Sequence, residues 1–304
     1  MARYVLTLIA AIDDKELMEA LVTRVEELLL ELGARPDEPD WLATGKACDV
    51  FFSTVPPQYA TPPVRTLIAD GFSNAKVDVI IQETADRRKR LVVADLESTL
   101  IENEMLDELA DFIGVRDKVA EITRLAMNGE IDFVTALKTR VALFKDLPET
   151  LLAEAAAGIR LMPGAPVFVA TSHAHGAYLA LATGGFSVFA RHVRTWLEFD
   201  AVFANELVVD EGRLTGEVRE PILTREGKRE ALIGLAAEQH IPLRLTLAIG
   251  DGANDLPMLE AAGLGVAFHA KPSVAERSAH RLDYCDLTAL LYAQGYRAAE
   301  FAAV

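Results

Sequence analysis

The sequence predicts an α/β protein in two parts: a small α/β module, then a doubly wound parallel sheet with a helical insert. Three observations predict this class. The first 83 residues alternate strand-like apolar runs with helical ones. From residue 91 onward, fully apolar strands alternate with helices, which is typical of buried parallel strands. Residues 103–157, which follow the first of these strands, have an almost entirely helical pattern.

The first module begins with the apolar run RYVLTLIA and continues with apolar residues at helical spacing. That helical pattern stops at Gly33, as expected for a glycine just beyond a helix end. We therefore predict an α/β module over residues 1–83. Its expected elements are strand 3–10, helix 13–33, strand 48–54, helix 61–72 and strand 76–82.

Segment 84–90 (TADRRKR) is polar and basic, and it lies directly before the first strand of the second part. A basic run can bind nucleic acid. The chain, however, has 46 acidic against 30 basic residues and a formal net charge of −16, which disfavours a polyanionic partner. We interpret the segment as a solvated linker and expect no nucleic-acid partner.

Composition also limits the location of the protein. Two cysteines in 304 residues are too few for a disulfide framework, so a reducing compartment is favoured. The apolar start meets Asp13 and Asp14 after about ten residues, too few to span a bilayer. We therefore expect a cytoplasmic protein with no membrane partner.

Polar residues follow the strands of the second part, residues 91–304. The strands 91–95, 177–183 and 243–251 end in Asp95, Thr183 and Asp251. A helix from Asn254 to Gly263 and a strand at 264–268 come next. Parallel strands present their carboxyl ends at one edge of the sheet, where α/β proteins bind ligands. We therefore expect these three side chains to meet.

The residue types at these strand ends indicate phosphoryl transfer. Asp95, Asp251 and Asp255 offer the oxygen ligands that suit Mg²⁺. Thr183 and the glycines after it can approach an anion closely, and Lys228 can neutralise a phosphate oxygen. Asp95 would then accept the phosphoryl group as an acyl phosphate, and the residue two places on would act as general acid and base.

These motifs carry a resemblance to a known family. DLEST, ATGG, Lys228 and GDGAND occur in the order found in the haloacid dehalogenase (HAD) superfamily. The segments STLIENEMLDELA, AMNGEIDFVTALKTRVALFKDLP, LMPGA and VAFHAKP narrow the resemblance, over residues 91 to about 298, to the phosphoserine phosphatase family. The resemblance implies a HAD-type Rossmann-like sheet with a helical cap at about 103–157. It also implies Mg²⁺-dependent hydrolysis of O-phospho-L-serine, the final step of serine biosynthesis, through an aspartyl-phosphate.

The resemblance further implies a role for each matching residue. Asp95 is the nucleophile, and Glu97 takes the general acid/base position. The expected Mg²⁺ ligands are Asp95, the backbone carbonyl of Glu97, and Asp251. Asp255 is expected to lie next to these ligands without binding the ion itself. The remaining roles are substrate contacts: Glu104 to the ammonium, Arg140 to the carboxylate, Thr183, Gly184 and Lys228 to the phosphate, Asn254 orienting it, and Met127 and Phe133 forming an apolar lid.

Glu97 departs from the family pattern, which has aspartate there. The backbone ligand survives this change, but the extra methylene moves the carboxyl group by about 1–1.5 Å, enough to affect proton transfer. Three accounts stay open: a slower phosphatase, a pocket reshaped for glutamate, or a weakened enzyme retained as an amino-acid-binding regulatory protein. Another small phosphomonoester, such as phosphothreonine or phosphohomoserine, is an alternative substrate.

The first module resembles ACT-like, ferredoxin-like domains in the order of its elements and its position before the catalytic part. This resemblance implies that the module binds an amino-acid effector or joins two copies of the chain in a homodimer.

Overall fold

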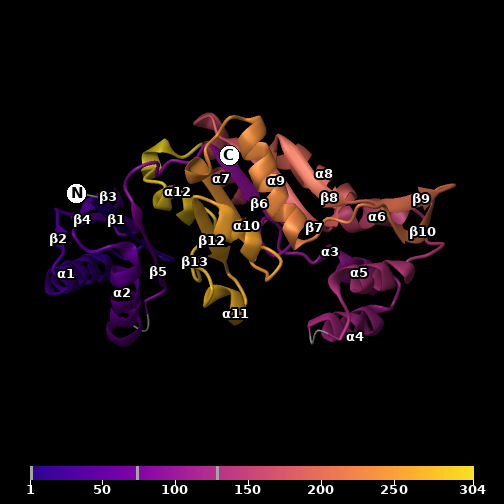
Figure 1. Ribbon diagram of the computed structural model, residues 1–304, viewed down its shortest axis with the longest axis horizontal. Coiled ribbons are helices and arrows are strands. Elements are labelled where there is room, and N and C mark those ends of the chain that lie inside the picture. The colour runs from indigo at the N-terminus through magenta and orange to yellow at the C-terminus, as the bar shows by residue number, and fades with distance from the viewer. Residues whose placement is uncertain (1–2, 73–74, 128–129) are drawn as a thin grey trace.

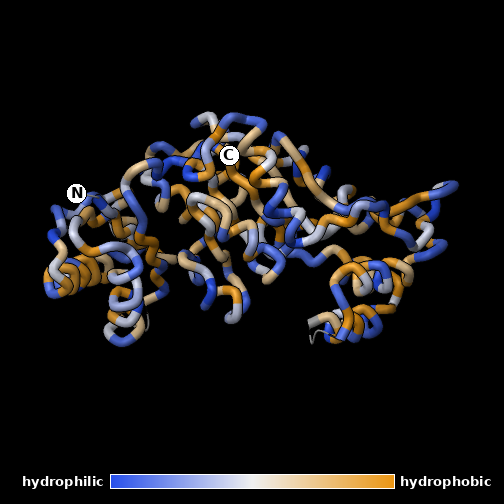
Figure 2. Tube along the Cα trace, viewed as in Figure 1, coloured by the Kyte–Doolittle hydropathy of each residue, from blue (hydrophilic) through white to orange (hydrophobic). Residues whose placement is uncertain are grey.

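The computed structural model describes residues 3–72, 75–127 and 130–304, except for the side chain of Met127. The N-terminal module lies at one end of an elongated molecule, the parallel sheet in the middle, and the helical insert at the other end (Figure 1). This arrangement confirms the predicted fold class. Along the Cα trace, apolar residues concentrate in the strands and helices, whereas hydrophilic residues are frequent in the loops (Figure 2).

The N-terminal domain is an antiparallel sheet with helices α1 and α2. Its strands are ordered β2-β4-β1-β5, and β3 also pairs with β4. Asp14 caps α1 by accepting a hydrogen bond from the backbone N–H of Leu17, and Gly33 beyond the helix has φ +81°. The elements are β1 (Arg3–Ala10), α1 (Lys15–Glu31), β2 (Arg35–Pro36), β3 (Asp40–Ala43), β4 (Ala47–Ser53), α2 (Pro57–Gly71) and β5 (Val77–Glu83).

Two details of this domain differ from the prediction. The short strands β2 and β3 were not expected, because neither is long enough to show a periodic pattern. Helix α2 begins at Pro57, four residues before the predicted start at 61, since proline is well suited to the first turn of a helix.

In the described ranges, six parallel strands form the second sheet, in the order β13-β12-β11-β6-β7-β8. The strands are β6 (Leu91–Ala94), β7 (Tyr178–Phe186), β8 (Ala201–Asn205), β11 (Thr246–Gly250), β12 (Leu264–Phe268) and β13 (His280–Leu282). Alternate residues of β6 point to opposite faces: Val92 packs in one core cluster, and Val93 packs in another. Burial of both faces explains the continuously apolar strands.

Helices cover both faces of this sheet (Figure 1). The core cluster that contains Val92 also contains residues of α7, α8 and α12, whereas the cluster that contains Val93 contains residues of α9, α10 and α11. These helices are α7 (Ala165–Ala174), α8 (Ser187–Leu197), α9 (Arg225–Glu238), α10 (Leu256–Ala261), α11 (Pro272–Ala275) and α12 (Ala289–Ala293), with 3₁₀ turns η1 (Leu243–Leu245) and η2 (Ala298–Glu300).

The predicted helical insert is confirmed as α3 (Met105–Phe112), α4 (Arg116–Met127), α5 (Phe133–Ala142) and α6 (Thr150–Ala156). An unpredicted antiparallel hairpin, β9 (Leu207–Asp210) and β10 (Arg213–Val218), packs against α5. Its turn places Glu211 and Gly212 at φ +45° and +74°. We refer to these helices and the hairpin together as the cap.

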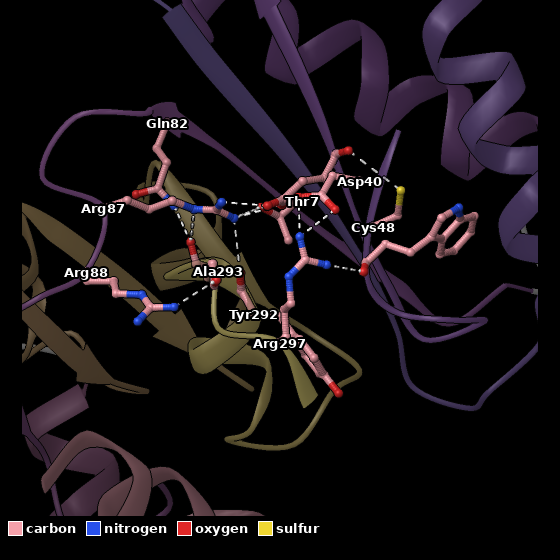
Figure 3. Close-up of polar contacts among 12 residues, drawn as sticks. Thr7, Asp40, Cys48, Gln82, Arg87, Arg88, Tyr292, Ala293 and Arg297 are labelled. Atoms are coloured by element: carbon pink, nitrogen blue, oxygen red, sulfur yellow. Dashed lines mark hydrogen bonds and ion pairs between the residues drawn. The ribbon is translucent and has the colours of Figure 1, made fainter. Parts of the chain in front are cut away.

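The interpretation of segment 84–90 as a solvated linker is wrong for two of its cations, because Arg87 and Lys89 are largely buried. Arg87 donates through both Nη atoms to the carboxylate of buried Asp49, at 2.6 and 2.7 Å. It also donates to the backbone carbonyls of Tyr292 and Ala293 (Figure 3). Arg87 thus joins the N-terminal domain to the end of the catalytic part.

Asp78 forms a second contact between the two parts. Its buried carboxylate, on β5, accepts hydrogen bonds from the consecutive backbone N–H groups of Asp283, Tyr284 and Cys285, at 2.8–3.1 Å. These residues lie between β13 and α12, so the N-terminal domain holds a loop of the catalytic part by its main chain.

No helix among the described residues is long and apolar enough to cross a membrane.

Candidate active site

The strand register brings the first two acids together. Strand β6 pairs with β11 so that Ala94 lies opposite Ile249, and Asp95 and Asp251 follow directly after the two strands. Strand β7 lies on the other side of β6. It continues to Phe186, so Thr183 lies inside the strand and not at its end, at a register shift in the pairing with β8.

Lys228 lies in the first turn of α9, whose N-cap Thr224 accepts a hydrogen bond from Gly227 N–H. Its side chain is 1% exposed, and its ammonium lies 2.8 Å from Asp95 Oδ1 and 2.7 Å from Asp255 Oδ1. Burial alone would lower the pKa of Lys228, but the carboxylates of Asp255 and Asp95 raise it above its ordinary value. The lysine therefore stays charged inside the protein.

Acidic groups outnumber the Lys228 ammonium at this edge of the sheet. Carboxylate oxygens of Asp95, Asp251 and Asp255 all lie within 4.8 Å of one another. Burial, with the charges of Asp95 and Asp255, raises the pKa of Asp251 to about 7. Burial and Asp95 also raise the pKa of Asp255, despite its contact with Lys228. The cluster has unneutralised negative charge and oxygen donors, so it fits a hard divalent cation.

Glu97 reaches the same site from the loop after β6. Its Oε1 accepts a hydrogen bond from Met105 N–H, at 3.0 Å, where α3 begins. Its carboxyl group also lies against Gly185, where an added Cβ would be 2.7 Å from Oε2. Burial, with the nearby charges of Glu104 and Asp95, raises the pKa of Glu97 to about 8. These surroundings favour the protonated form of this carboxyl group.

The cap provides the other side of the site. Glu104 precedes α3 and accepts a hydrogen bond from the Ser98 hydroxyl, at 2.8 Å. Arg140 on α5 forms no ion pair with a carboxylate of the described residues; it donates to Ala136 O and lies 3.5 Å from Thr123 Oγ1. Phe133, at the start of α5, lies over Gly184, whose added Cβ would be 3.5 Å from its ring. The side chain of Met127, predicted in the lid, lies outside the described residues.

A pocket of about 370 Å³ lies between the sheet edge and the cap. The predicted residues that line it are Asp95, Glu97, Glu104, Phe133, Arg140, Thr183, Gly184, Asp251 and Asn254. Lys228 and Asp255 are not among its lining residues; Lys228 contacts both Asp95 and Asp255, and carboxylate oxygens of these two aspartates lie within 4.8 Å of each other. The structure thus brings together every predicted site residue whose side chain it describes.

Sequence reasoning missed two charged residues of the pocket, Asp107 and Lys271. Asp107 lies on α3, three residues after Glu104 and therefore on the same helix face. Lys271 follows the carboxyl end of β12, so the rule that located Asp95 and Asp251 would also have found it.

The sheet, its acidic carboxyl edge and the helical cap define a Rossmann-like α/β protein with a capped pocket whose clustered carboxylates could hold a metal ion. Residues 92–260 match the model of the haloacid dehalogenase-like hydrolases, and the chain belongs to this family.

Within the family, the relatives of this chain are phosphoserine phosphatases, and the chain belongs to that group. The Vibrio cholerae phosphoserine phosphatase is 41% identical over 222 residues, which cover 70% of this chain and 68% of the relative. The match to this chain covers 58% to 64% of the lengths of three further phosphoserine phosphatases.

Two crystal structures resemble nearly the whole chain. A HAD family hydrolase from Salmonella enterica serovar Typhi has a TM-score of 0.83 at 27% identity, covering 96% of this chain and 98% of that one. A probable phosphoserine phosphatase from Vibrio cholerae, in unliganded form, has a TM-score of 0.76 at 30% identity, covering 98% and 88%.

Proposed function

We propose that this protein hydrolyses O-phospho-L-serine to L-serine and inorganic phosphate, as the last step of serine biosynthesis. One observation carries the proposal: Asp95, paired with buried Lys228 at the sheet edge, faces a pocket whose cap side carries Glu104 and Arg140. A nucleophile and a phosphate-binding cation therefore lie opposite an acid and a guanidinium, the pair that an amino acid requires.

The phosphate would lie between Asp95 and Gly184. An oxygen of Asp95 attacks phosphorus, the bond from phosphorus to the serine oxygen breaks, and an aspartyl-phosphate forms. Lys228 would neutralise charge on the transferred group, and the main-chain N–H of Gly184 would donate to one of its oxygens. The Thr183 hydroxyl fixes this end of β7 by accepting a hydrogen bond from Gly185 N–H at 2.9 Å. Asn254 lines the pocket next to Asp251 and would orient the phosphate.

Mg²⁺ is the cation that fits these residues. Asp95, Asp251 and the backbone carbonyl of Glu97 would hold it, because hard oxygen donors with excess negative charge are what Mg²⁺ requires. Both oxygens of Asp255 already accept hydrogen bonds, from Lys228 and from Gly252 N–H, which supports a role outside the direct ligand set. When bound, the ion supplies positive charge that draws the phosphate towards Asp95.

Glu97 would act as general acid and then as general base. Its raised pKa, about 8, keeps it protonated at neutral pH, so it can protonate the departing serine oxygen. The resulting carboxylate then takes a proton from the water that hydrolyses the aspartyl-phosphate. The contacts with Met105 N–H and Gly185 give the longer side chain a defined position in the pocket.

The cap would select the amino acid. Arg140, which lacks a carboxylate partner among the described residues, offers a bidentate site for the substrate carboxylate. Glu104 would accept the substrate ammonium, and Phe133, with Met127, would exclude water above the phosphate.

The test is phosphate release from O-phospho-L-serine by the full chain. We expect release that requires Mg²⁺, stops with EDTA, and is lost in Asp95→Asn. Asp210→Asn, an exposed change on the hairpin, is the matched control and should keep full activity. Release by Asp95→Asn at the wild-type rate would contradict the nucleophile, and a preference for phosphothreonine or phosphohomoserine would change the substrate.

We further propose a division into an ACT-like domain at 1–83, a linker at 84–90 and a phosphatase domain at 91–304, in a cytoplasmic protein. The antiparallel order β2-β4-β1-β5, which is that of ferredoxin-like domains, supports the ACT-like domain. An amino-acid effector or a homodimer would be its function. Calorimetry with L-serine, and sedimentation of the full chain, test these two roles; no heat and a monomer would exclude both.

A further inference from the structure

A second cavity, here called the seam groove, lies between the N-terminal domain and the catalytic part. It encloses about 560 Å³. Helix α2 and the end of β5 form one side, and the residues before β13 and in η1 form the other. None of the described residues that line it also lines the active-site pocket. Its ionisable lining residues are Arg65, Glu83, Asp86, Lys89, Arg244 and His280.

Lys89 is the unusual residue of the groove, because it is a buried cation that forms no ion pair within the described ranges. Lys89 is 7% exposed, and its ammonium donates to the backbone carbonyls of Asp86 and Arg244, at 2.8 and 2.9 Å. No carboxylate of the described residues forms an ion pair with it, and burial lowers its pKa to about 8 although the charge of Asp86 acts in the opposite direction. An ammonium has three N–H donors, so one is left for a further acceptor.

Two arginines, Arg65 and Arg244, also line the seam groove. Arg65 on α2 reaches across the seam and donates to Ala279 O, at 3.2 Å, without an ion pair to any described carboxylate. The charges of Arg65 and Lys89, in addition to burial, lower the pKa of His280 to about 4. Arg244 is paired with Asp86, so these two charges cancel.

The seam groove is therefore positive within a chain whose formal net charge is −16. Arg65, Lys89 and Arg244 stand against Glu83 and Asp86, an excess of one positive charge. An unneutralised buried cation is costly unless an anion shares its site. The size of the groove is in the range of small-molecule sites.

We propose that the seam groove binds a small anion through a phosphate or carboxylate group, held by Lys89 and Arg65. Because Arg65 belongs to the N-terminal domain and Arg244 and His280 belong to the catalytic part, the ligand would strengthen the contact between the two. The proposal does not depend on the proposed enzymatic function.

His280 reports on the groove directly. We would follow the Cε1–H resonance of His280 in the full chain by NMR against pH, assigning it with His280→Gln. The probes are inorganic phosphate and, separately, L-serine, which distinguish phosphate from carboxylate recognition. A bound anion near an imidazole favours its charged form, so we expect its pKa to rise by about one unit with the correct probe.

The matched variants are Lys89→Met, which keeps the length of the side chain, and Lys46→Met, another partly buried lysine that does not line the groove. The response of His280 should be lost in the first and kept in the second. Arg65→Gln serves if Lys89→Met does not fold. A pKa of His280 that neither probe changes, or an equal response in Lys89→Met and wild type, would overturn the proposal. The pKa of His280 is measured without turnover, so loss of enzymatic activity and loss of this site remain distinguishable.

Discussion

Replacing Lys228 with methionine tests the electrostatic design of the site. The change removes the cation that contacts Asp95 and Asp255 at 2.8 and 2.7 Å, and it leaves their carboxylates buried. Removing one partner of a buried pair costs roughly 3–5 kcal/mol. Protonating one stranded acid gives a similar figure: holding an aspartate neutral at pH 7, against an unfolded pKa of about 3.9, costs about 4 kcal/mol.

The same reasoning fixes the pH dependence of Lys228→Met. The stranded acid has a folded pKa above its unfolded one, so its penalty grows above the unfolded pKa and shrinks as pH falls. At pH 5 the cost of protonation is only about 1.5 kcal/mol. We therefore expect the loss in the free energy of unfolding to decrease from about 4 kcal/mol at pH 7 to about 1.5 kcal/mol at pH 5.

Urea unfolding in EDTA, followed by far-UV circular dichroism, measures both values. Lys118→Met, an exposed lysine on α4, is the control and should change stability by under about 0.5 kcal/mol. Adding Asp255→Asn to Lys228→Met should recover about half of the loss, because one stranded charge disappears. A loss under about 1 kcal/mol at pH 7, or one that increases towards pH 5, would refute the reasoning.

Three further predictions concern single side chains. Glu97→Asp should raise kcat for phosphoserine, by up to about 10²-fold, because a proton-transfer group displaced by about 1 Å can cost that much. Arg140→Met should raise KM for phosphoserine roughly 10- to 100-fold, from the loss of a charged hydrogen-bonded pair, and should leave phosphoethanolamine hydrolysis unchanged. The pKa of His280 is about 4 in the folded protein and 6.5 in the unfolded chain, so stability that is present above pH 6.5 is lost as pH falls. Between pH 7 and pH 5, the free energy of urea unfolding of wild type should therefore decrease by about 2 kcal/mol more than that of His280→Gln.

Different results would contradict each of these. A lower kcat for Glu97→Asp would mean that the pocket is built around glutamate. Equal losses on phosphoserine and phosphoethanolamine would remove Arg140 from carboxylate binding. Identical pH profiles for wild type and His280→Gln would show that this histidine is not held neutral.

Much of the site could be predicted because it follows from strand ends. Asp95 and Asp251 follow fully apolar strands, and parallel pairing of β6 with β11 leaves them side by side. Lys228 is different: a single lysine at a helix start has no local signal, so only its place in an ordered set of motifs predicted it. The shift of Thr183 into β7 came from the irregular pairing with β8, which a single strand pattern does not encode.

What the sequence did not predict depends on distant partners or on short elements. Arg87 is buried by acceptors that are distant in the sequence: Asp49 is 38 residues away and Tyr292 is 205 residues away. The local sequence shows neither partner, so the basic segment was predicted to be solvated. The hairpin 207–218 did carry a signal, since Glu211-Gly212 between two short apolar runs suits a tight turn with positive φ.

Asp78 has a practical consequence for anyone who wishes to shorten this enzyme. A chain cut at residue 91 would strand three successive amides, at Asp283, Tyr284 and Cys285, that now share one carboxylate acceptor. Water would have to enter beside β13 to replace it, since amides without acceptors are rarely left dry. The first domain thus supports the outer strand of the catalytic sheet, and a shortened enzyme would need another acceptor for these three amides.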